Sequence, residues 1–297
     1  MGAEMDWRMQ VVTRAIKART PLADMAQRAK RAVAGYRPNE ANIRSTLNSL
    51  RKLKGLMDRH GIDLNGAVIL EIGSGWFPII PIILKLSGAK TIYLSDIVRR
   101  IDAGTFETAR QIVSKNFQSL SVDFRFNPGS DKQLQNIQLD EFDYIAPLRP
   151  EFIENSSIDL ILSRTVLEHI PVADLRLLLI QLKSKLKPTG HAAHNIDNSD
   201  HYEHNDKSIS RVNFLTWTER KHRFLYWIAG NNGENRLRHH EYAEMFRETG
   251  YCILDELANV DAATLNALPN LPLKEPFRSM HPEQVAALGS NFLLGVT

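Results

Sequence analysis

The 297-residue chain lacks the features that mark several classes of protein. Its single cysteine, Cys252, excludes an internal disulfide and a structural cysteine-rich zinc site. The longest apolar run, Phe77 to Leu84, is far shorter than the roughly 20 residues that a membrane span needs. Charged residues interrupt the first thirty positions, which argues against a signal peptide or an anchor. We therefore expect a cytoplasmic protein with no membrane partner.

An excess of one charge sign is also missing, because 37 Lys and Arg residues face 34 Asp and Glu residues. The balance is uneven along the chain, since residues 1–61 carry a net charge of +8 and the remainder carries −5. The basic positions of 1–61 are spread around apolar residues at helical spacing, and few aromatic residues accompany them. We therefore expect an N-terminal helical cap over 1–61 and no nucleic-acid partner. The apolar residues predicted to face inward are Met5, Met9, Val12, Ile16, Ile43, Leu47, Leu50, Leu53 and Met57.

Short apolar runs follow residue 62 and predict a buried sheet. They end near Ile72, Leu94, Tyr144, Ser163 and Ile196, with helical stretches near 105–116 and 172–186 between them. Strands that alternate with helices indicate a mostly parallel sheet covered on both faces. Residues 62–196 are thus the predicted core, and 197–240 a polar, aromatic-containing insertion that folds over it as a lid. Residues 241–297 are predicted to supply a helix and two closing strands.

A glycine-rich turn follows the first of these runs, in the sequence V-I-L-E-I-G-S-G-W-F-P of residues 68–78. Gly73 and Gly75 allow a tight turn at the carboxyl end of a strand, and Asp96, at the end of the next strand, is placed to accept ribose hydroxyls. A dinucleotide site needs a third glycine where Pro78 stands, and Glu71 would repel a pyrophosphate but suits an amine. The residues therefore favour a ligand that carries a cationic amine over a nicotinamide dinucleotide. An incidental glycine turn in an α/β protein remains the alternative.

This turn resembles the first motif of the class I S-adenosylmethionine-dependent methyltransferases. Residues 159–170 are similar to the fourth-strand motif of that superfamily, and residues 186–190 to its L-K-P-G-G turn, in which Thr189 replaces the first glycine. The resemblance covers about residues 65–196. The later D-H, N-F-L and N-R-L-R segments are more loosely similar to bacterial methyltransferases of glycan and secondary-metabolite pathways. The resemblance to the superfamily implies a Rossmann-like α/β fold with a seven-stranded, mostly parallel sheet. It also implies S-adenosylmethionine as cofactor and methyl transfer, by in-line displacement, to a small polar or natural-product acceptor.

The resemblance further implies the roles of individual residues. Glu71 and the backbone of residues 73–75 would hold the methionine portion of the cofactor, and Asp96 its ribose. Trp76 stands beside the expected sulfonium, where a cation–π contact and simple core packing are both open. Asp143 is either an adenine contact or the cap of a turn. The complete set of predicted cofactor-binding residues is Glu71, Gly73, Ser74, Gly75, Trp76, Asp96, Ile97, Asp143, Tyr144 and Ser163.

Polar residues follow the fifth predicted strand, whose carboxyl end faces the cofactor pocket. His194 and His201 are the candidate general bases, with His169 as a third, and Arg164 either borders the substrate or pairs with Glu168. A polar network, a solvated loop and a metal site are all open here. No helical histidine pair supports a metal, so none is assigned. The predicted substrate-binding residues are Asp197, Asp200, Tyr202, Asn235 and Arg236.

Two alternatives use the same chain differently. In the first, the amine of the cofactor attacks its own γ-carbon, releasing methylthioadenosine and a cyclic amino acid such as azetidine-2-carboxylate. In the second, the chain is a non-catalytic module that binds S-adenosylmethionine or RNA. The identity of the released nucleoside separates the first alternative from methyl transfer. The oligomeric state is left open.

Overall fold

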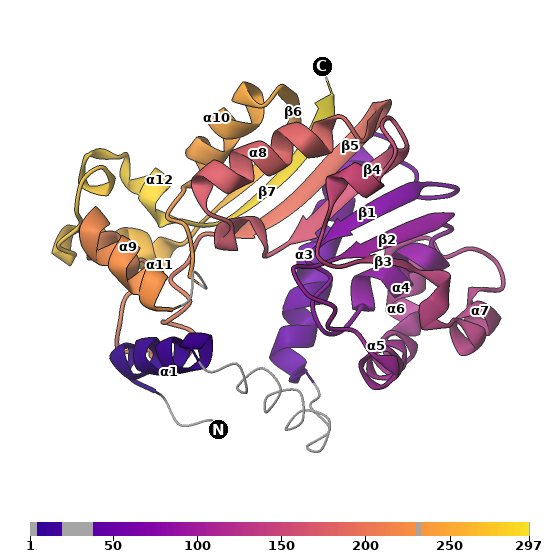
Figure 1. Ribbon diagram of the computed structural model, residues 1–297, viewed down its shortest axis with the longest axis horizontal. Coiled ribbons are helices and arrows are strands. Elements are labelled where there is room, and N and C mark those ends of the chain that lie inside the picture. The colour runs from indigo at the N-terminus through magenta and orange to yellow at the C-terminus, as the bar shows by residue number, and fades with distance from the viewer. Residues whose placement is uncertain (1–4, 20–37, 230–232, 297) are drawn as a thin grey trace.

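The computed structural model describes residues 5–19, 38–229 and 233–296 (Figure 1). Within these residues, seven strands form one sheet in the order β3-β2-β1-β4-β5-β7-β6. The first five strands are parallel, and β7 runs antiparallel to both of its neighbours. The strands are β1 Val68–Ile72, β2 Thr91–Ser95, β3 Asp143–Ile145, β4 Ile158–Arg164, β5 Leu186–Asp197, β6 Tyr251–Val260 and β7 Ala287–Val296. The predicted fold class is confirmed.

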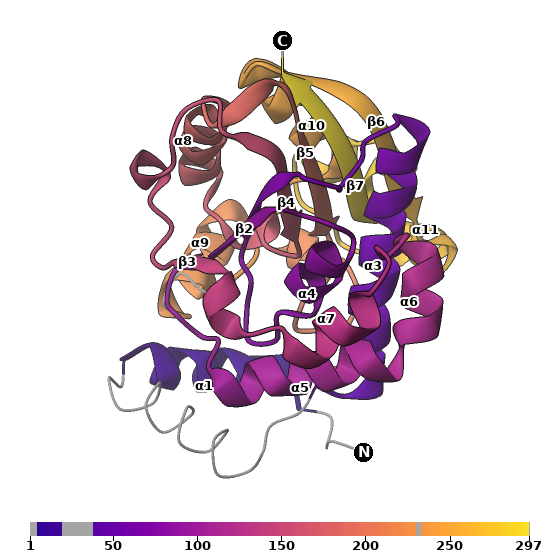
Figure 2. The same cartoon turned by 90° about the vertical axis from the view of Figure 1, so that its right-hand side faces the viewer.

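Helices cover both faces of the sheet, as the continuous apolar strands require. One face is covered by α3 Glu40–Arg59, α4 Ile79–Leu86, α5 Ala103–Lys115, α6 Phe117–Asp123 and α7 Ser130–Asn136. The other face is covered by α8 Val172–Lys183 and α10 His239–Glu248, so α3 and α8 lie on opposite sides (Figure 2). Because successive strand residues point to opposite faces, Ile69 joins the first core and Leu70 the second.

A third hydrophobic core lies apart from the sheet, in a unit that we call the side lobe. It combines α1 Trp7–Arg19, residues 198–229 with α9 Glu219–Ile228, and residues 261–286 with α11 Ala262–Ala267 and α12 Pro282–Ala286. Its centre contains Val11, Phe214 and Phe277, and Trp7 stacks on Trp217 with ring centroids 5.2 Å apart. Figure 1 shows α1 beside α9 and away from α3. Residues 198–229 of the predicted lid are therefore a folded part of this lobe.

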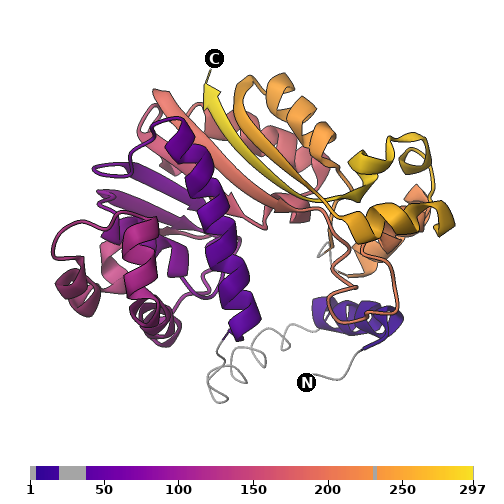
Figure 3. The same cartoon turned by 180° about the vertical axis from the view of Figure 1, so that it is seen from behind.

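The structure divides the predicted N-terminal cap. Helix α3 lies across one face of the sheet (Figure 3), where Leu50 and Met57 are fully buried, whereas α1 belongs to the side lobe. The predicted inward face of α1 is wrong, because Met9 is 57% exposed while Val11 is 7% exposed. Helical spacing fixes which residues share a face but does not say which face finds a partner. The parts of the predicted cap at 1–4 and 20–37, and the side chain of Ile16, lie outside the described residues.

Short 3₁₀ turns join the elements at η1 Leu139–Glu141, η2 Pro150–Phe152, η3 Leu167–His169, η4 Asn213–Thr216, η5 Leu268–Asn270 and η6 Phe277–Ser279. Across the described ranges, every helix is too short or too polar to cross a bilayer.

Candidate active site

The glycine turn after β1 is anchored to the end of β2. The carbonyl of Ser95 accepts hydrogen bonds of 2.8 Å from the N–H groups of both Gly73 and Ser74, and the Asp96 carboxylate accepts one of 3.1 Å from Gly75. Gly73 has a φ of +73°, and a Cβ placed there would lie 2.3 Å from a methyl group of Val166. Residue 73 therefore needs glycine for its conformation and for the close approach of the loop after β4.

A pocket of about 410 Å³ lies against this turn. Its walls come from residues 71–77, the start of α3, and Arg164 and Thr165 at the end of β4. Glu71 is 4% exposed, and its Oε2 has no hydrogen-bond partner within the described part of the chain. Burial raises the pKa of Glu71 to about 7, against hydrogen bonding from Ser74 that lowers it. A buried carboxylate oxygen of this kind suits a cationic group in the pocket.

Two parts of the pocket were missed in the sequence. Ser45 and Thr46 of α3 line it, and the Arg164 guanidinium donates a hydrogen bond of 3.3 Å to the Ser45 hydroxyl. Asn39, which caps α3 by accepting from Asn42 N–H at 2.8 Å, is a sequence signal for where this helix begins.

Thr165 adopts a φ of +49°, a left-handed conformation that is unfavourable for a β-branched residue. Such conformations concentrate at functional sites, which agrees with its place in the pocket wall.

The residues predicted to contact the ribose and adenine do not all lie at the carboxyl edge of the sheet. Asp96 begins the loop after β2, where its Oδ1 accepts the Ile97 N–H at 2.7 Å, and Ile97 is 74% exposed. The Tyr144 hydroxyl accepts the Arg100 N–H at 3.0 Å. Asp143 instead begins β3 opposite Tyr93, two residues before the carboxyl edge where ligands bind, so the prediction for Asp143 is corrected. Its position in a three-residue strand could not be fixed from the sequence.

His194 and Ser163 lie inside the second core and do not line the pocket. They are register partners on β5 and β4, with His194 Nδ1 2.8 Å from Ser163 Oγ. His194 is 1% exposed and stacks on Phe246, and burial lowers its pKa to about 3. The imidazole is neutral but sealed from any substrate, so the predicted roles of His194 as base and Ser163 as cofactor contact are corrected. The next residue on β4, Arg164, points to the opposite side and reaches the pocket.

His201 lies between two carboxylates beyond the ends of β4 and β5. Its Nδ1 is 3.0 Å from Glu234 Oε1, and its Nε2 is 3.6 Å from Asp197 Oδ2. Burial alone would lower the pKa of His201, but these two carboxylates outweigh it and raise the pKa to about 10. Both ring nitrogens thus face carboxylates of this chain, and His201 is not among the residues that line the pocket at the glycine turn, so its role as general base stays a prediction.

Four predicted substrate-binding residues make contacts inside the protein, and two of them, Asn235 and Arg236, also line a surface pocket of about 930 Å³ beside α9. Asp200 is fully buried, and its two oxygens accept the N–H groups of Tyr202 and Phe214, each at 2.8 Å. Tyr202 itself packs in the side-lobe core. Asn235 donates to the carbonyls of Leu167 and Ile170, and Arg236 to those of Phe214 and Trp217. Of the predicted set, Asp197 remains at the sheet edge, 27% exposed.

Arg164 connects the pocket to this edge. It lines the pocket at the glycine turn. Burial lowers its pKa, while the nearby carboxylates of Glu168, Asp197 and Glu71 raise it. Its Nε is buried without a hydrogen-bond partner within residues 5–19, 38–229 and 233–296. The predicted alternative is an ion pair between Arg164 and Glu168. Within the described residues, the two side chains do not approach to the 4.0 Å nitrogen–oxygen distance of an ion pair.

The sheet order, the antiparallel β7 and the acidic glycine turn at the end of β1 define a class I S-adenosylmethionine-dependent methyltransferase. The chain belongs to the methyltransferase domain family, whose model matches residues 44–256. It is an enzyme that transfers the methyl group of S-adenosylmethionine. The predicted family, reaction and cofactor are thus confirmed, and nothing found here supports the cyclisation alternative.

Two solved structures are similar to this chain at low sequence identity. One is an S-adenosylmethionine-dependent methyltransferase from Mesorhizobium loti, with 13% identity, a TM-score of 0.47 and coverage of 82% of this chain and 95% of that one. The other is 1,6-didemethyltoxoflavin-N1-methyltransferase from Burkholderia thailandensis, with 12% identity, a TM-score of 0.46 and coverage of 94% and 91%. No curated protein matches the sequence.

Proposed function

We propose that the pocket at the glycine turn holds S-adenosylmethionine and that the acceptor is a small polar molecule bound at the ends of β4 and β5. The unpartnered Glu71 Oε2 in the pocket is the observation that carries this assignment. Bound S-adenosylmethionine supplies a methyl group on a sulfonium, which leaves as a thioether. The protein therefore has to orient the acceptor and exclude water.

The pocket residues divide the binding of the cofactor between them. The Glu71 carboxylate accepts the ammonium of the methionine portion, a charge-assisted hydrogen bond in a site from which water is excluded. Asp96, fixed by the Gly75 N–H, keeps oxygen lone pairs for the ribose hydroxyls. Trp76 lies in the pocket wall and covers the methyl-bearing end. Tyr144 and Ile97 border the adenine side.

Arg164 and Asp197 are placed to hold the acceptor. The buried Arg164 Nε donates to an acceptor oxygen, because a guanidinium N–H without a partner in the interior is costly. Asp197 lies one strand away at the carboxyl end of β5 and offers an acceptor for a hydroxyl or amine. The side lobe encloses this side of the molecule, and residues 62–196 with 241–260 and 287–296 form the cofactor-binding core.

The test combines product analysis with one charge-removing substitution. Incubation of the purified protein with S-adenosylmethionine and a set of polar acceptors is expected to release S-adenosylhomocysteine, detected by liquid chromatography with mass spectrometry. Glu71→Gln keeps the shape of the side chain and removes its charge. Because a hydrogen bond to a charged group contributes about 1.5–3 kcal/mol, we expect calorimetry to show about 10- to 100-fold weaker binding of S-adenosylhomocysteine.

The matched control is Glu151→Gln, which changes an exposed glutamate of η2 and is expected to leave binding unchanged. Equal affinities of wild type and Glu71→Gln would refute the pocket assignment. Release of methylthioadenosine without a methylated product would refute methyl transfer to an external acceptor.

A further inference from the structure

Five side chains converge beyond the ends of β4 and β5, and we call them the histidine–carboxylate cluster: Glu168, His169, Asp197, His201 and His204. One ligand atom from each of Glu168, His169 and His201 lies within 4.8 Å of the other two. The same holds for Asp197, His201 and His204, so His201 is common to both groups. The methyl-transfer geometry described above uses Asp197 alone among them.

The imidazoles are held from outside the cluster by their Nδ1 atoms. His169 Nδ1 lies 3.1 Å from the carbonyl of Gly233, and His201 Nδ1 lies 3.0 Å from Glu234 Oε1. A ring that donates Nδ1–H to a carbonyl or carboxylate presents the lone pair of Nε2 on its other side. Metal-binding histidines are fixed by this arrangement, in which the outer partner sets the tautomer and the orientation of the ring.

The two carboxylates follow the same pattern. Asp197 Oδ1 accepts from the N–H and hydroxyl of Ser199, at 2.9 and 2.6 Å, which leaves Oδ2 directed at His201 and His204. Glu168 Oε1 accepts the Asp197 N–H at 3.3 Å. Glu168 is 1% exposed, and its Oε2 has no hydrogen-bond partner among the described residues. His201 Nε2 is also buried and has no hydrogen-bond partner among them. Two polar atoms are therefore directed into the cluster without a hydrogen bond.

The spacing of the inner atoms fits a shared ion better than direct contact. Asp197 Oδ2 lies 3.6 Å from His201 Nε2 and 3.8 Å from His204 Nε2, beyond the usual 2.7–3.2 Å of a hydrogen bond. Ligands about 2.1 Å from a tetrahedral ion are about 3.4 Å from one another. Imidazole nitrogen together with carboxylate oxygen suits divalent ions such as Zn²⁺, Mn²⁺ and Co²⁺ and disfavours the all-oxygen preference of Ca²⁺.

We propose that the histidine–carboxylate cluster binds one divalent transition-metal ion on the acceptor side of the active site. His201, which both groups share, is its central ligand, joined by Glu168 and His169 from one group and by Asp197 and His204 from the other. The coordination positions that protein atoms leave open hold an oxygen of the acceptor, a role that rests on the proposed function. Metal binding itself does not rest on the proposed function, because the proposed ligands are all side chains of this protein.

The test measures binding of Co²⁺ alone and Zn²⁺ alone to the chelator-treated full chain, without cofactor or acceptor. We expect one equivalent of Co²⁺ to produce visible d–d absorption and Zn²⁺ to compete with a chromophoric chelator. His169→Gln and Asp197→Asn are expected to weaken Zn²⁺ binding by more than about 100-fold, and Glu234→Gln, which removes the support of His201 Nδ1, by about 10- to 100-fold. His281→Gln, a change of an exposed histidine, is the matched control and is expected to bind as wild type does.

Absence of stoichiometric binding by wild type would overturn the proposal and leave an ion-pair network only. Binding that His169→Gln and Asp197→Asn leave unchanged would overturn it as well. Circular dichroism identifies a variant that fails to fold, and the wild-type titration and Glu234→Gln then decide. Binding of S-adenosylhomocysteine, measured in the same preparations, shows whether a failure concerns the metal site or the proposed function.

Discussion

Arg238 offers a sharp test of what holds the side lobe to the sheet. It is fully buried, and its guanidinium donates to the carbonyls of Asn198, Val285 and Ala287 at 2.6, 2.8 and 2.7 Å. These carbonyls belong to the segment after β5 and to the junction of α12 with β7. Arg238→Met keeps an unbranched apolar stem, although a shorter one, and removes the five donors.

The magnitude follows from two opposing contributions. Three hydrogen bonds from a charged donor contribute about 1.5–3 kcal/mol each. Burial opposes them, since it lowers the pKa of Arg238 from 12.5 to about 10, a penalty on the order of 3 kcal/mol at about 1.4 kcal/mol for each pH unit. The difference leaves a loss of about 1.5–6 kcal/mol in the free energy of unfolding, a large part of the 5–15 kcal/mol typical of a folded protein.

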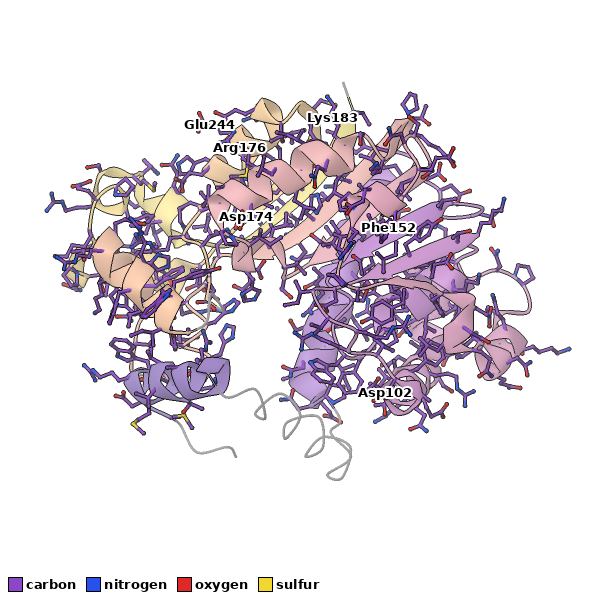
Figure 4. The ribbon with its side chains drawn as sticks, in the orientation of Figure 1. Asp102, Phe152, Asp174, Arg176, Lys183 and Glu244 are labelled. Atoms are coloured by element: carbon purple, nitrogen blue, oxygen red, sulfur yellow. The ribbon has the colours of Figure 1, made fainter. Side chains whose placement is uncertain are left out.

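Urea denaturation followed by tryptophan fluorescence and circular dichroism measures this loss. The control is Arg176→Met, because Arg176 lies on the outer side of α8 (Figure 4), where it pairs with the exposed Glu248. An exposed ion pair contributes at most about 1 kcal/mol. If Arg238→Met loses no more stability than Arg176→Met, the reasoning that the buried guanidinium fastens the lobe is refuted.

Three further predictions concern the active site. Gly73→Ala is expected to weaken S-adenosylhomocysteine binding in calorimetry and to lower the melting temperature more than Gly66→Ala does. Both glycines have a φ above +70°, but only a Cβ at residue 73 would meet Val166. Equal effects of the two substitutions would contradict this reasoning. The affinity for S-adenosylmethionine should rise between pH 6 and 8 as Glu71, with its pKa near 7, ionises, and should be flat in Glu71→Gln. The pH profile of kcat should be unchanged in His194→Asn, because an imidazole with a pKa near 3 stays neutral throughout. Loss of the acidic limb in this variant would contradict the prediction.

The cofactor half of the site could be predicted because its signals are local. A strand, two glycines at fixed spacing and a carboxylate at the end of the next strand constrain one another through backbone geometry alone, and Gly73, Gly75 and Asp96 lie as expected. The parallel sheet is equally local, since apolar runs that are buried on both faces have a distinct pattern.

The acceptor half could not be predicted in the same way. Asp200 and Arg236 are polar residues in a polar segment, yet they satisfy buried backbone groups that arise only when distant segments meet. The sequence does not tell such a residue from one that faces a ligand. His194 shows a related limit, because a one-residue shift along β5 separates the core from the pocket edge, and periodicity does not fix that choice.

The place of β7 has a consequence for how this protein is made. It lies between β5 and β6 and contributes Phe292, Leu293 and Leu294, all fully buried. During synthesis, β5 and β6 leave the ribosome before the strand that pairs with both of them. Until residues 287–296 emerge, two sheet edges with unpaired backbone groups are exposed, and such edges recruit other chains. The nascent chain therefore depends on shielding at those edges, and a ribosome that stalls before residue 287 would release an aggregation-prone product.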